Sequence, residues 1–410
     1  MRIVHTADWH LGDRLGRIDR TFDLRQRVEQ VADICEKEQA DVLLVAGDLF
    51  SELARPDGLR DAIGHLQQTF ASFLARGGTI LAITGNHDNE SFCQTLWHAM
   101  SLAAPAQSAA RQRAATGRLH LATEPTWLRL PDPSGTFDVA FVLMPYPTPA
   151  QYLNTANRFE TFVEKNQMLS ESFSRRLAEL FAEARDVNTG PTILVAHITV
   201  RADYEYQLFR MNPGDDVSIS ANEVPPGLAY AALGHIHKPG GVAEHIRYSG
   251  SIDRLDLGEQ ADAKSVLILD VTDRGLVSVP RQEMLDATPI YEVLITDPAE
   301  DLASLRRRFP DARRDLVKLS IRYRSGRDSL EEVLRRLEEI FPRWYSREWV
   351  DVAQLGPSLN AEAAVAKSFR ETVLEYLDRE LSQHTPAEKE AILARAERLI
   401  ADLEQGRPTP

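Results

Sequence analysis

The stretch that decides the fold is RIVHTADWH, residues 2–10, in which an apolar run leads directly into a polar motif. The apolar part is typical of a buried β-strand, and the polar part supplies an aspartate and a histidine. Similar strand-like runs precede four further motifs. The five motifs are Asp8-Trp9-His10, Gly47-Asp48, Gly85-Asn86-His87-Asp88, His197 and Gly234-His235-Ile236-His237. We expect them to line one edge of one sheet and to form a site for two metal ions.

The composition is that of an ordinary globular protein, with 410 residues of which 43% are hydrophobic and 26% charged. This length predicts two or three domains. No apolar run is long enough to span a membrane, and the N-terminus has no signal-peptide pattern. The only cysteines, Cys35 and Cys93, are far apart, which indicates reduced thiols and a cytoplasmic location. The net charge of −14 argues against a generic nucleic-acid coat protein, but not against an enzyme with a local positive surface.

The first half of the chain alternates strand and helix. Strands are predicted at 2–7, 41–46 and 79–84, separated by helices near 22–39 and 56–76. This order predicts parallel pairing with helices on both faces, and the continuously apolar strands agree with burial on both sides. The fold class is therefore α/β, a four-layer α/β/β/α sandwich over residues 1–285.

Two smaller parts are predicted beyond the sandwich. Residues 286–350 are expected to form a small α+β domain, in which the strand Leu316–Arg324 alternates apolar and polar residues. After a linker near Gly356-Pro357, two amphipathic helices are expected within 361–404. A terminal helix pair has no large core of its own, so it either packs back on the body or docks to a partner.

Hydrolysis of a phosphodiester needs polarised phosphoryl oxygens and a hydroxide at neutral pH, and two metal ions about 3.5–4 Å apart supply both. Asp8 and His10 are two residues apart on a segment expected to be extended, so both can face one ion. His235 and His237 repeat that spacing, and Asp48 after the small Gly47 is the natural bridge. The candidate metal ligands are Asp8, His10, Asp48, Asn86, His197, His235 and His237. Nitrogen and oxygen ligands without a thiolate suit Mn, Fe or Zn better than Ca and disfavour an iron–sulfur site.

Two residues of the third motif are expected to act on the substrate instead. His87 is suited to act as an acid or a positive hydrogen-bond donor at the scissile phosphate. Asp88 could hold that imidazole in one tautomer. Any single histidine at a strand end is more often structural, and His5 is interpreted as a hydrogen-bonded core residue. The prediction of a metal site therefore rests on the five motifs taken together in their order, and not on any single histidine.

The order D-x-H, GD, GNHD, H and GHxH resembles the calcineurin-like metallophosphoesterase superfamily. The segments MRIVHTADWHLG, VAGDLF, GNHD, ALGHIHKP and YSGSIDRLDLGE are similar to the SbcD-type nucleases of bacterial SbcCD DNA repair complexes. The sequence similarity covers about residues 1–280. Beyond it, only the order of a small middle domain and a terminal helix pair is similar. The GNHE and GDxxDRG motifs of phosphoprotein phosphatases are not matched, since Asp88 ends the third motif and Leu-Phe-Ser follows Asp48.

The resemblance implies a role for each part of the chain. One metal would be held by Asp8, His10, Asp48 and His237, and the other by Asp48, Asn86, His197 and His235. Mn²⁺ would be the usual activating ion, with His87 catalytic and Asp88 supporting it. Homodimerisation would use the segments 56–76 and 90–101, the middle domain would cap DNA, and residues 361–404 would bind a coiled-coil ATPase of the SbcC type.

The function expected from this resemblance is a Mn²⁺-dependent DNA nuclease subunit, a double-strand exonuclease and single-strand endonuclease in DNA break and hairpin processing, located in the cytoplasm at the nucleoid. Residues 306–327 hold nine basic and two acidic residues and include the DNA-contact candidates Lys318, Arg322 and Arg324. This basic stretch either contacts phosphates or is an ion-paired surface. The alternatives are a phosphodiesterase for small molecules and a catalytically silent scaffold subunit.

Overall fold

The computed structural model describes residues 1–103, 114–153, 159–201 and 216–353, together with Lys389, Ile392, Leu393, Arg395 and Ala396. Nearly all of the expected helix pair at 361–404 lies outside the described residues. The chain divides into two compact units, and the first takes Met1–Leu294, Leu305–Ser320 and Arg336–Arg347. The second takes Ile295–Ser304, Ile321–Arg335 and the chain from Glu348 onward. The expected division into 1–285, 286–350 and 361–404 stays a prediction.

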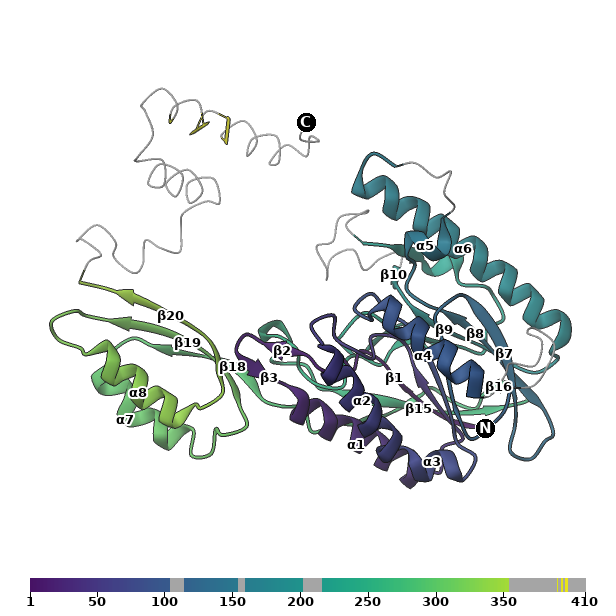
Figure 1. The fold of residues 1–410 in the computed structure, drawn as a ribbon, viewed down its shortest axis with the longest axis horizontal. Helices are drawn as coiled ribbons and strands as arrows, with labels where there is room; N and C mark the ends of the chain where they lie inside the picture. Colours follow the sequence, from purple (N-terminus) through teal and green to yellow (C-terminus); the bar gives the residue numbers. More distant parts are fainter. Residues whose placement is uncertain are drawn as a thin grey trace. The chain divides into compact units, whose positions relative to one another are not determined.

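A seven-stranded sheet forms one half of the sandwich (Figure 1). Its parallel part is β1 (Arg2–Thr6), β4 (Val42–Val45), β5 (Thr79–Ile83) and β6 (Leu119–Ala122). β15 (Ser265–Thr272) pairs antiparallel with the other side of β1, and β16 (Gly275–Leu276) and β17 (Arg281–Met284) pair with β15. The predicted β-α-β-α-β order with parallel pairing is confirmed.

A six-stranded sheet forms the other half. Its strands, in spatial order, are β13 (Gly240–Ala243), β14 (Ile246–Tyr248), β12 (Tyr230–Gly234), β9 (Thr192–His197), β8 (Asp138–Met144) and β7 (Thr126–Pro131). β9 pairs parallel with both β12 and β8. Beside the two large sheets, β10 (Thr199–Arg201) pairs with β11 (Ser218–Ser220), and β2 (Arg14–Leu15) pairs with β3 (Ile18–Asp19).

Three apolar clusters show that the sandwich has four layers. The helices α1 (Thr21–Lys37), α2 (Pro56–Thr69), α3 (Ala71–Ala75) and α4 (Glu90–Ala103) share one cluster with the seven-stranded sheet. The helices α5 (Pro149–Tyr152) and α6 (Phe162–Val187) share a second with the six-stranded sheet. The third lies between the sheets. Within β4, Leu43 packs toward the helices while Leu44 packs between the sheets, as expected for a strand buried on both faces.

A three-stranded sheet follows in the chain, in the order β18 (Ile290–Ile295), β19 (Leu316–Tyr323) and β20 (Trp344–Asp351). Its two helices are α7 (Pro298–Arg308) and α8 (Leu330–Ile340). The predicted alternation along β19 is confirmed, because Leu319 and Ile321 are buried while Arg322 is exposed. Short 3-10 helices η2 (Ala221–Glu223) and η3 (Leu257–Glu259) complete the described elements. Among all the described residues of the chain, no helix is long and apolar enough to cross a membrane.

One helix differs from its prediction. The single helix expected over 56–76 is broken at Phe70, where φ is −97° and ψ is 7°. The Phe70 ring is buried, stacks on Trp9 at 6.0 Å between centroids and contacts Phe73 edge-on at 6.3 Å. The break allows this ring to pack beneath the first motif, an effect of tertiary packing that helical periodicity does not report.

Candidate metal centre

The five motifs meet at the carboxyl ends of five strands, but these strands belong to two sheets. β1, β4 and β5 are neighbours in the seven-stranded sheet and lead into the first three motifs, while β9 and β12 are neighbours in the six-stranded sheet and lead into the last two. The expectation of one edge of one sheet is therefore wrong. A strand buried on both faces has the same apolar pattern in either sheet of a sandwich, so the pattern does not report which sheet it joins.

The backbone at the site takes an uncommon conformation. φ is positive at Asp8 (54°), His10 (47°), Asp48 (52°) and His235 (91°), which are four of the five such non-glycine residues in the described part of the chain. Non-glycine residues seldom adopt this left-handed region outside turns and functional sites. Asp8 and His10 are thus not on an extended segment as expected. Their side chains still meet, because the amides of Asp8 and His10 donate to the carbonyls of Gly47 and Asp48 at 3.0 and 2.9 Å.

Three glycines allow the strand ends to approach one another closely. A Cβ at Gly47, where φ is +94°, would collide with the His197 ring, and one at Gly85 would collide with the Asp48 carboxylate. A Cβ at Gly234 would collide with the carbonyl of Ala46. These contacts explain why the motifs contain glycine at these positions.

Three of the four histidine ligand candidates have one ring nitrogen satisfied by a protein acceptor. The acceptors are the Ala46 carbonyl at 2.7 Å from Nδ1 of His197, Asp216 at 2.7 Å from Nε2 of His235, and Glu259 at 2.8 Å from Nδ1 of His237. The other ring nitrogens face the cluster. Nε2 of His197 lies 3.3 Å from Oδ2 of Asp48, Nδ1 of His235 lies 3.0 Å from Oδ1 of Asn86, and Nε2 of His237 lies 4.0 Å from Oδ1 of Asp8. Such outer bonds orient metal-ligating imidazoles and fix their tautomers.

The fourth histidine gives the clearest sign of a ligand. Nε2 of His10 is buried and has no hydrogen-bond partner among the described residues, although it lies 3.6 Å from Oδ2 of Asp48. A buried polar atom without a partner is rare in native structures and requires an explanation. A metal ion beside Asp8 and Asp48 would satisfy this nitrogen, so the residues present fit the implied metal.

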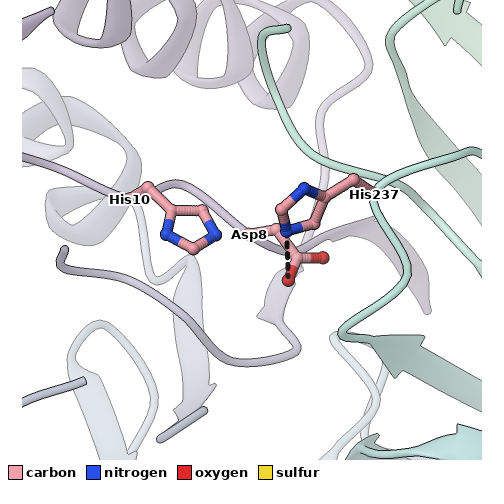
Figure 2. Close-up of side chains that lie close together, drawn as sticks. All are labelled: Asp8, His10 and His237. Atoms are coloured by element: carbon pink, nitrogen blue, oxygen red, sulfur yellow. Dashed lines mark ion pairs between the residues drawn. The ribbon is translucent and has the colours of Figure 1, made fainter. Parts of the chain in front are cut away.

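Two groups of side chains could each hold an ion. They are Asp8, His10 and His237, and Asp8, Asp48 and His197, with the ligand atoms of each group within 4.8 Å of one another. Figure 2 shows the first group, in which a dashed line joins the His237 ring to the Asp8 carboxylate and the His10 ring lies to one side of both, 5.2 Å from the His237 ring between centroids. The two groups share Asp8, while Asp48 approaches histidines of both. The geometry thus offers two carboxylates, and not only the expected Asp48, as links between the ions.

The charges at the site are strongly coupled. Burial raises the pKa of Asp8 above its ordinary value. Burial acts in the same direction on Asp48, but the charges of His197 and His10 outweigh it and hold the pKa of Asp48 below its usual range. Burial lowers the pKa of His197, yet its pairing with Asp48 raises that pKa to about 9. Metal binding at this pair therefore releases a proton.

His87 and Asp88 are placed differently from each other. The half-buried His87 donates its backbone N–H to Oδ1 of Asp48 at 2.8 Å, and its ring lies 5.1 Å from that of His10. The Asp88 carboxylate accepts from the backbone amides of Leu49, Phe50 and Gly85 at 3.2, 2.8 and 2.8 Å. Asp88 thus ties the loop after β4 to the loop after β5, while Nδ1 of the His87 ring lies 3.8 Å from the carboxylate of Glu52.

The expected bond between Asp88 and the His87 ring is therefore replaced by bonds to backbone. Because Asp88 is buried, its pKa rises to about 7, and the charge of Asp48 adds to this rise while the backbone N–H groups oppose it. The physical reason for the difference is that three buried backbone amides, of Leu49, Phe50 and Gly85, need an acceptor, and the Asp88 carboxylate supplies it.

Three polar residues near the ligands were missed from the sequence. The Asp216 carboxylate, besides bonding His235, accepts from the hydroxyls of Tyr146 at 3.2 Å and Thr199 at 2.8 Å. Tyr146 follows β8, a parallel neighbour of β9, so the strand-end rule could have found it. Asp216 lies in no motif. Glu259 lies within the segment YSGSIDRLDLGE, which contributed to the family resemblance without an assigned role.

The three DNA-contact candidates lie on β19 and just after it. Lys318 is half-buried and lies 3.6 Å from Glu292, whereas Arg322 and Arg324 are exposed and form no ion pair with a described residue. Elsewhere in the basic stretch, Arg314 and Arg327 are paired with acidic residues. The ion-paired interpretation thus holds for part of this stretch.

The site defines the class of protein. Residues 1–239 match the family model of the calcineurin-like phosphoesterases, and the chain belongs to that family. It is a metal-dependent phosphoesterase. The chain is 29% identical over 279 residues to the D subunit of the nuclease SbcCD from Bacillus subtilis, a match that covers 66% of each protein. It is 26% identical over 320 residues to the protein of the same name from Staphylococcus epidermidis, covering 75% of each.

A further relative is the DNA double-strand break repair protein Mre11 of Aeropyrum pernix, which is 25% identical over 337 residues. That match covers 78% of this chain and 73% of the relative. The match to the Bacillus protein falls just short of two thirds of its length.

Proposed function

We propose that this chain is the nuclease subunit of an SbcCD-type complex and hydrolyses phosphodiester bonds in DNA during the processing of breaks and hairpins. The observation that carries the proposal is the intact donor set, in which the buried Nε2 of His10 has no described hydrogen-bond partner beside two carboxylates. A silent scaffold has no need of such a site. The choice of DNA as substrate rests on the named nuclease relatives.

The proposed ligands divide between two ions. Asp8, His10, Asp48 and His237 would hold one, and Asp48, Asn86, His197 and His235 the other. When bound, such ions polarise phosphoryl oxygens and make hydroxide available near neutral pH. Nitrogen and oxygen donors without a thiolate suit Mn²⁺ as well as Fe or Zn, and both cysteines are buried and free. The resemblance to SbcD-type nucleases selects Mn²⁺ among these ions as the proposed activating ion.

His87 is proposed to act directly on the substrate. Its backbone bond to Asp48 fixes the loop, while its half-buried ring remains within reach of a bound phosphate. From there the imidazole can donate a proton or a hydrogen bond to the leaving oxygen during in-line attack by water. Asp88 is proposed to support catalysis by holding the same loop through Gly85, rather than by contacting the His87 ring.

Other parts of the chain are proposed to serve assembly and DNA binding. Exposed Trp97 and Leu102 on α4 support homodimerisation through the segments 56–76 and 90–101. Exposed Arg322 and Arg324 support phosphate contacts by the small sheet, with Lys318 a weaker candidate. We place the docking of an SbcC-type ATPase at 361–404 and the protein in the cytoplasm at the nucleoid.

One assay separates the proposal from its alternatives. The purified chain, with Mn²⁺ and with or without its ATPase partner, is incubated with duplex DNA, single-stranded DNA and bis-p-nitrophenyl phosphate. Cleavage of DNA, stimulated by the partner, is expected. Cleavage of the small ester alone would indicate a small-molecule phosphodiesterase, and no cleavage of any substrate would indicate a scaffold. Truncation before residue 361 should abolish partner binding and spare hydrolysis of the small ester.

A further inference from the structure

A closed ring of hydrogen bonds surrounds His237. Nδ1 of His237 bonds Oε1 of Glu259 at 2.8 Å, and Nζ of Lys264 donates to Oε2 of Glu259 at 2.6 Å. The same ammonium donates to the main-chain carbonyl of His237 at 2.9 Å. A single lysine therefore holds both the backbone of this histidine and the partner of its ring.

Burying the charges of Glu259 and Lys264 has a large desolvation cost. Lys264 is fully buried and Glu259 is nearly so, with 9% of its side chain exposed. The hydroxyl of Ser251 and the backbone N–H of Leu255 also donate to Oε2 of Glu259, at 3.3 and 3.2 Å. Removing two charges from water costs several kcal/mol per ion, on the order of what their attraction returns. Global stability is thus a poor explanation for this pair.

Only one histidine of the cluster is held by this ring of hydrogen bonds. His197 is held by a neutral carbonyl, and His10 has no partner for Nε2 in the described residues. Asp216, which holds His235, bonds two hydroxyls and forms no ion pair with a described lysine or arginine. Within the part of the chain described, only His237 is held by a carboxylate with its own buried ammonium.

We propose that Glu259 and Lys264 are positioning residues, which hold the His237 imidazole with Nε2 toward Asp8 and thereby set the affinity of the Asp8–His10–His237 metal position. This inference rests on the proposed metal-dependent function. Neither Glu259 nor Lys264 bonds a side chain of the second proposed position, Asp48, Asn86, His197 and His235, so the affinity of that position should be independent of the Glu259–Lys264 pair.

The physical basis is the fixed tautomer. With Nδ1–H donating to Glu259, the lone pair of Nε2 is directed at the cluster, and the carboxylate makes that nitrogen a better donor to a cation. Lys264 restrains the carboxylate and balances its charge. Loss of an outer partner of this kind lowers metal affinity by about 10- to 100-fold.

The test uses the full-length chain and four variants, which are Glu259→Gln, Lys264→Met, the double variant and Glu283→Gln. The last is a matched control, because Glu283 also accepts from a lysine, Lys37, at 2.8 Å, but at the surface. Calorimetric titration with MnCl₂ gives the two affinities, and electron paramagnetic resonance distinguishes a single bound Mn²⁺ from a coupled pair. For Glu259→Gln and Lys264→Met we expect one affinity to fall about 10- to 100-fold, the other to stay unchanged, and an uncoupled Mn²⁺ signal at intermediate concentration.

The double variant separates positioning from folding. It removes both buried charges, so the urea midpoint of the metal-free chain should recover relative to Lys264→Met, while the weakened affinity should not recover. The proposal is overturned if both affinities stay within about twofold of wild type in Glu259→Gln, if both fall equally, or if affinity recovers together with the midpoint in the double variant. These affinities decide the positioning role whether or not the wild-type chain cleaves DNA.

Discussion

Low pH is expected to decrease the free energy of unfolding, because one buried histidine forms hydrogen bonds between the two large sheets. His5 lies on β1 of the seven-stranded sheet and is fully buried. Its Nδ1 lies 3.0 Å from the hydroxyl of Tyr230, and its Nε2 lies 3.2 Å from the carbonyl of Leu233, both on β12 of the other sheet. These bonds confirm the interpretation of His5 as a hydrogen-bonded core histidine, and they fit the neutral ring, in which Nε2–H donates to Leu233 and Nδ1 accepts from the hydroxyl of Tyr230.

The size of the effect follows from the pKa. Burial lowers the pKa of His5 from 6.5 to about 3, although the bond to Leu233 opposes the shift. Below pH 6.5 the unfolded chain binds a proton at His5 that the folded chain does not, so stability is full above pH 6.5 and decreases as the pH falls toward 3. Each pH unit in that window costs about 1.4 kcal/mol, which gives roughly 2 kcal/mol at pH 5 and roughly 4 kcal/mol at pH 3, where the folded ring is itself half-protonated.

The assay is urea unfolding of the metal-free chain at pH 7.5 and pH 5.0, for wild type, His5→Gln and the control His245→Gln. His245 is exposed on the loop between β13 and β14. Between the two pH values, wild type and the control should lose about 2 kcal/mol more stability than His5→Gln, because only His5→Gln lacks the buried titrating ring. Equal losses in all three proteins would refute the role assigned to His5.

Three further substitutions test the site. Asp48→Asn should lose both metal ions, since Oδ2 of Asp48 lies 3.3 Å from Nε2 of His197, and elemental analysis showing two ions per chain would contradict the bridge. His87→Gln should keep both ions and lose about 10²- to 10⁴-fold in DNA cleavage, and a native rate with two ions bound would refute its catalytic role. Gly47→Ala should lose metal affinity in calorimetric titration because its Cβ collides with the His197 ring, whereas Gly58→Ala, whose Cβ meets open space, should retain it.

The grouping of the candidate ligands could be predicted because it follows a local rule. Each motif begins within two residues of the end of an apolar strand, and the structure brings Asp8, His10, Asp48, His197 and His237 into two groups of possible metal ligands. The layers were predictable for a similar reason. Runs such as Val42–Val45 are apolar at every position, which only a strand covered on both faces permits.

The remaining features depend on contacts between distant segments. Periodicity could not show that the motifs divide between two sheets, since β9 and β4 have the same apolar pattern. It also could not identify Asp216 and Glu259, which lie 19 and 22 residues from the histidines they bond. The bonding partner of Asp88 could not be predicted for the same reason. Sequence adjacency suggested His87, whereas the carboxylate accepts from the amides of Leu49 and Phe50, 39 and 38 residues away.

The four non-glycine residues with positive φ indicate that the backbone of the candidate site is fixed without a metal ion. Each non-glycine residue in this region costs on the order of 1–3 kcal/mol, and four of them surround the same cluster. The strain is held by bonds that do not involve a metal, such as those from Asp8 and His10 to the β4 loop and from the His235 amide to Asp8 at 3.1 Å. Because these bonds fix the backbone before any ion binds, affinity depends on the orientation of the imidazoles, which the partners of His197, His235 and His237 control.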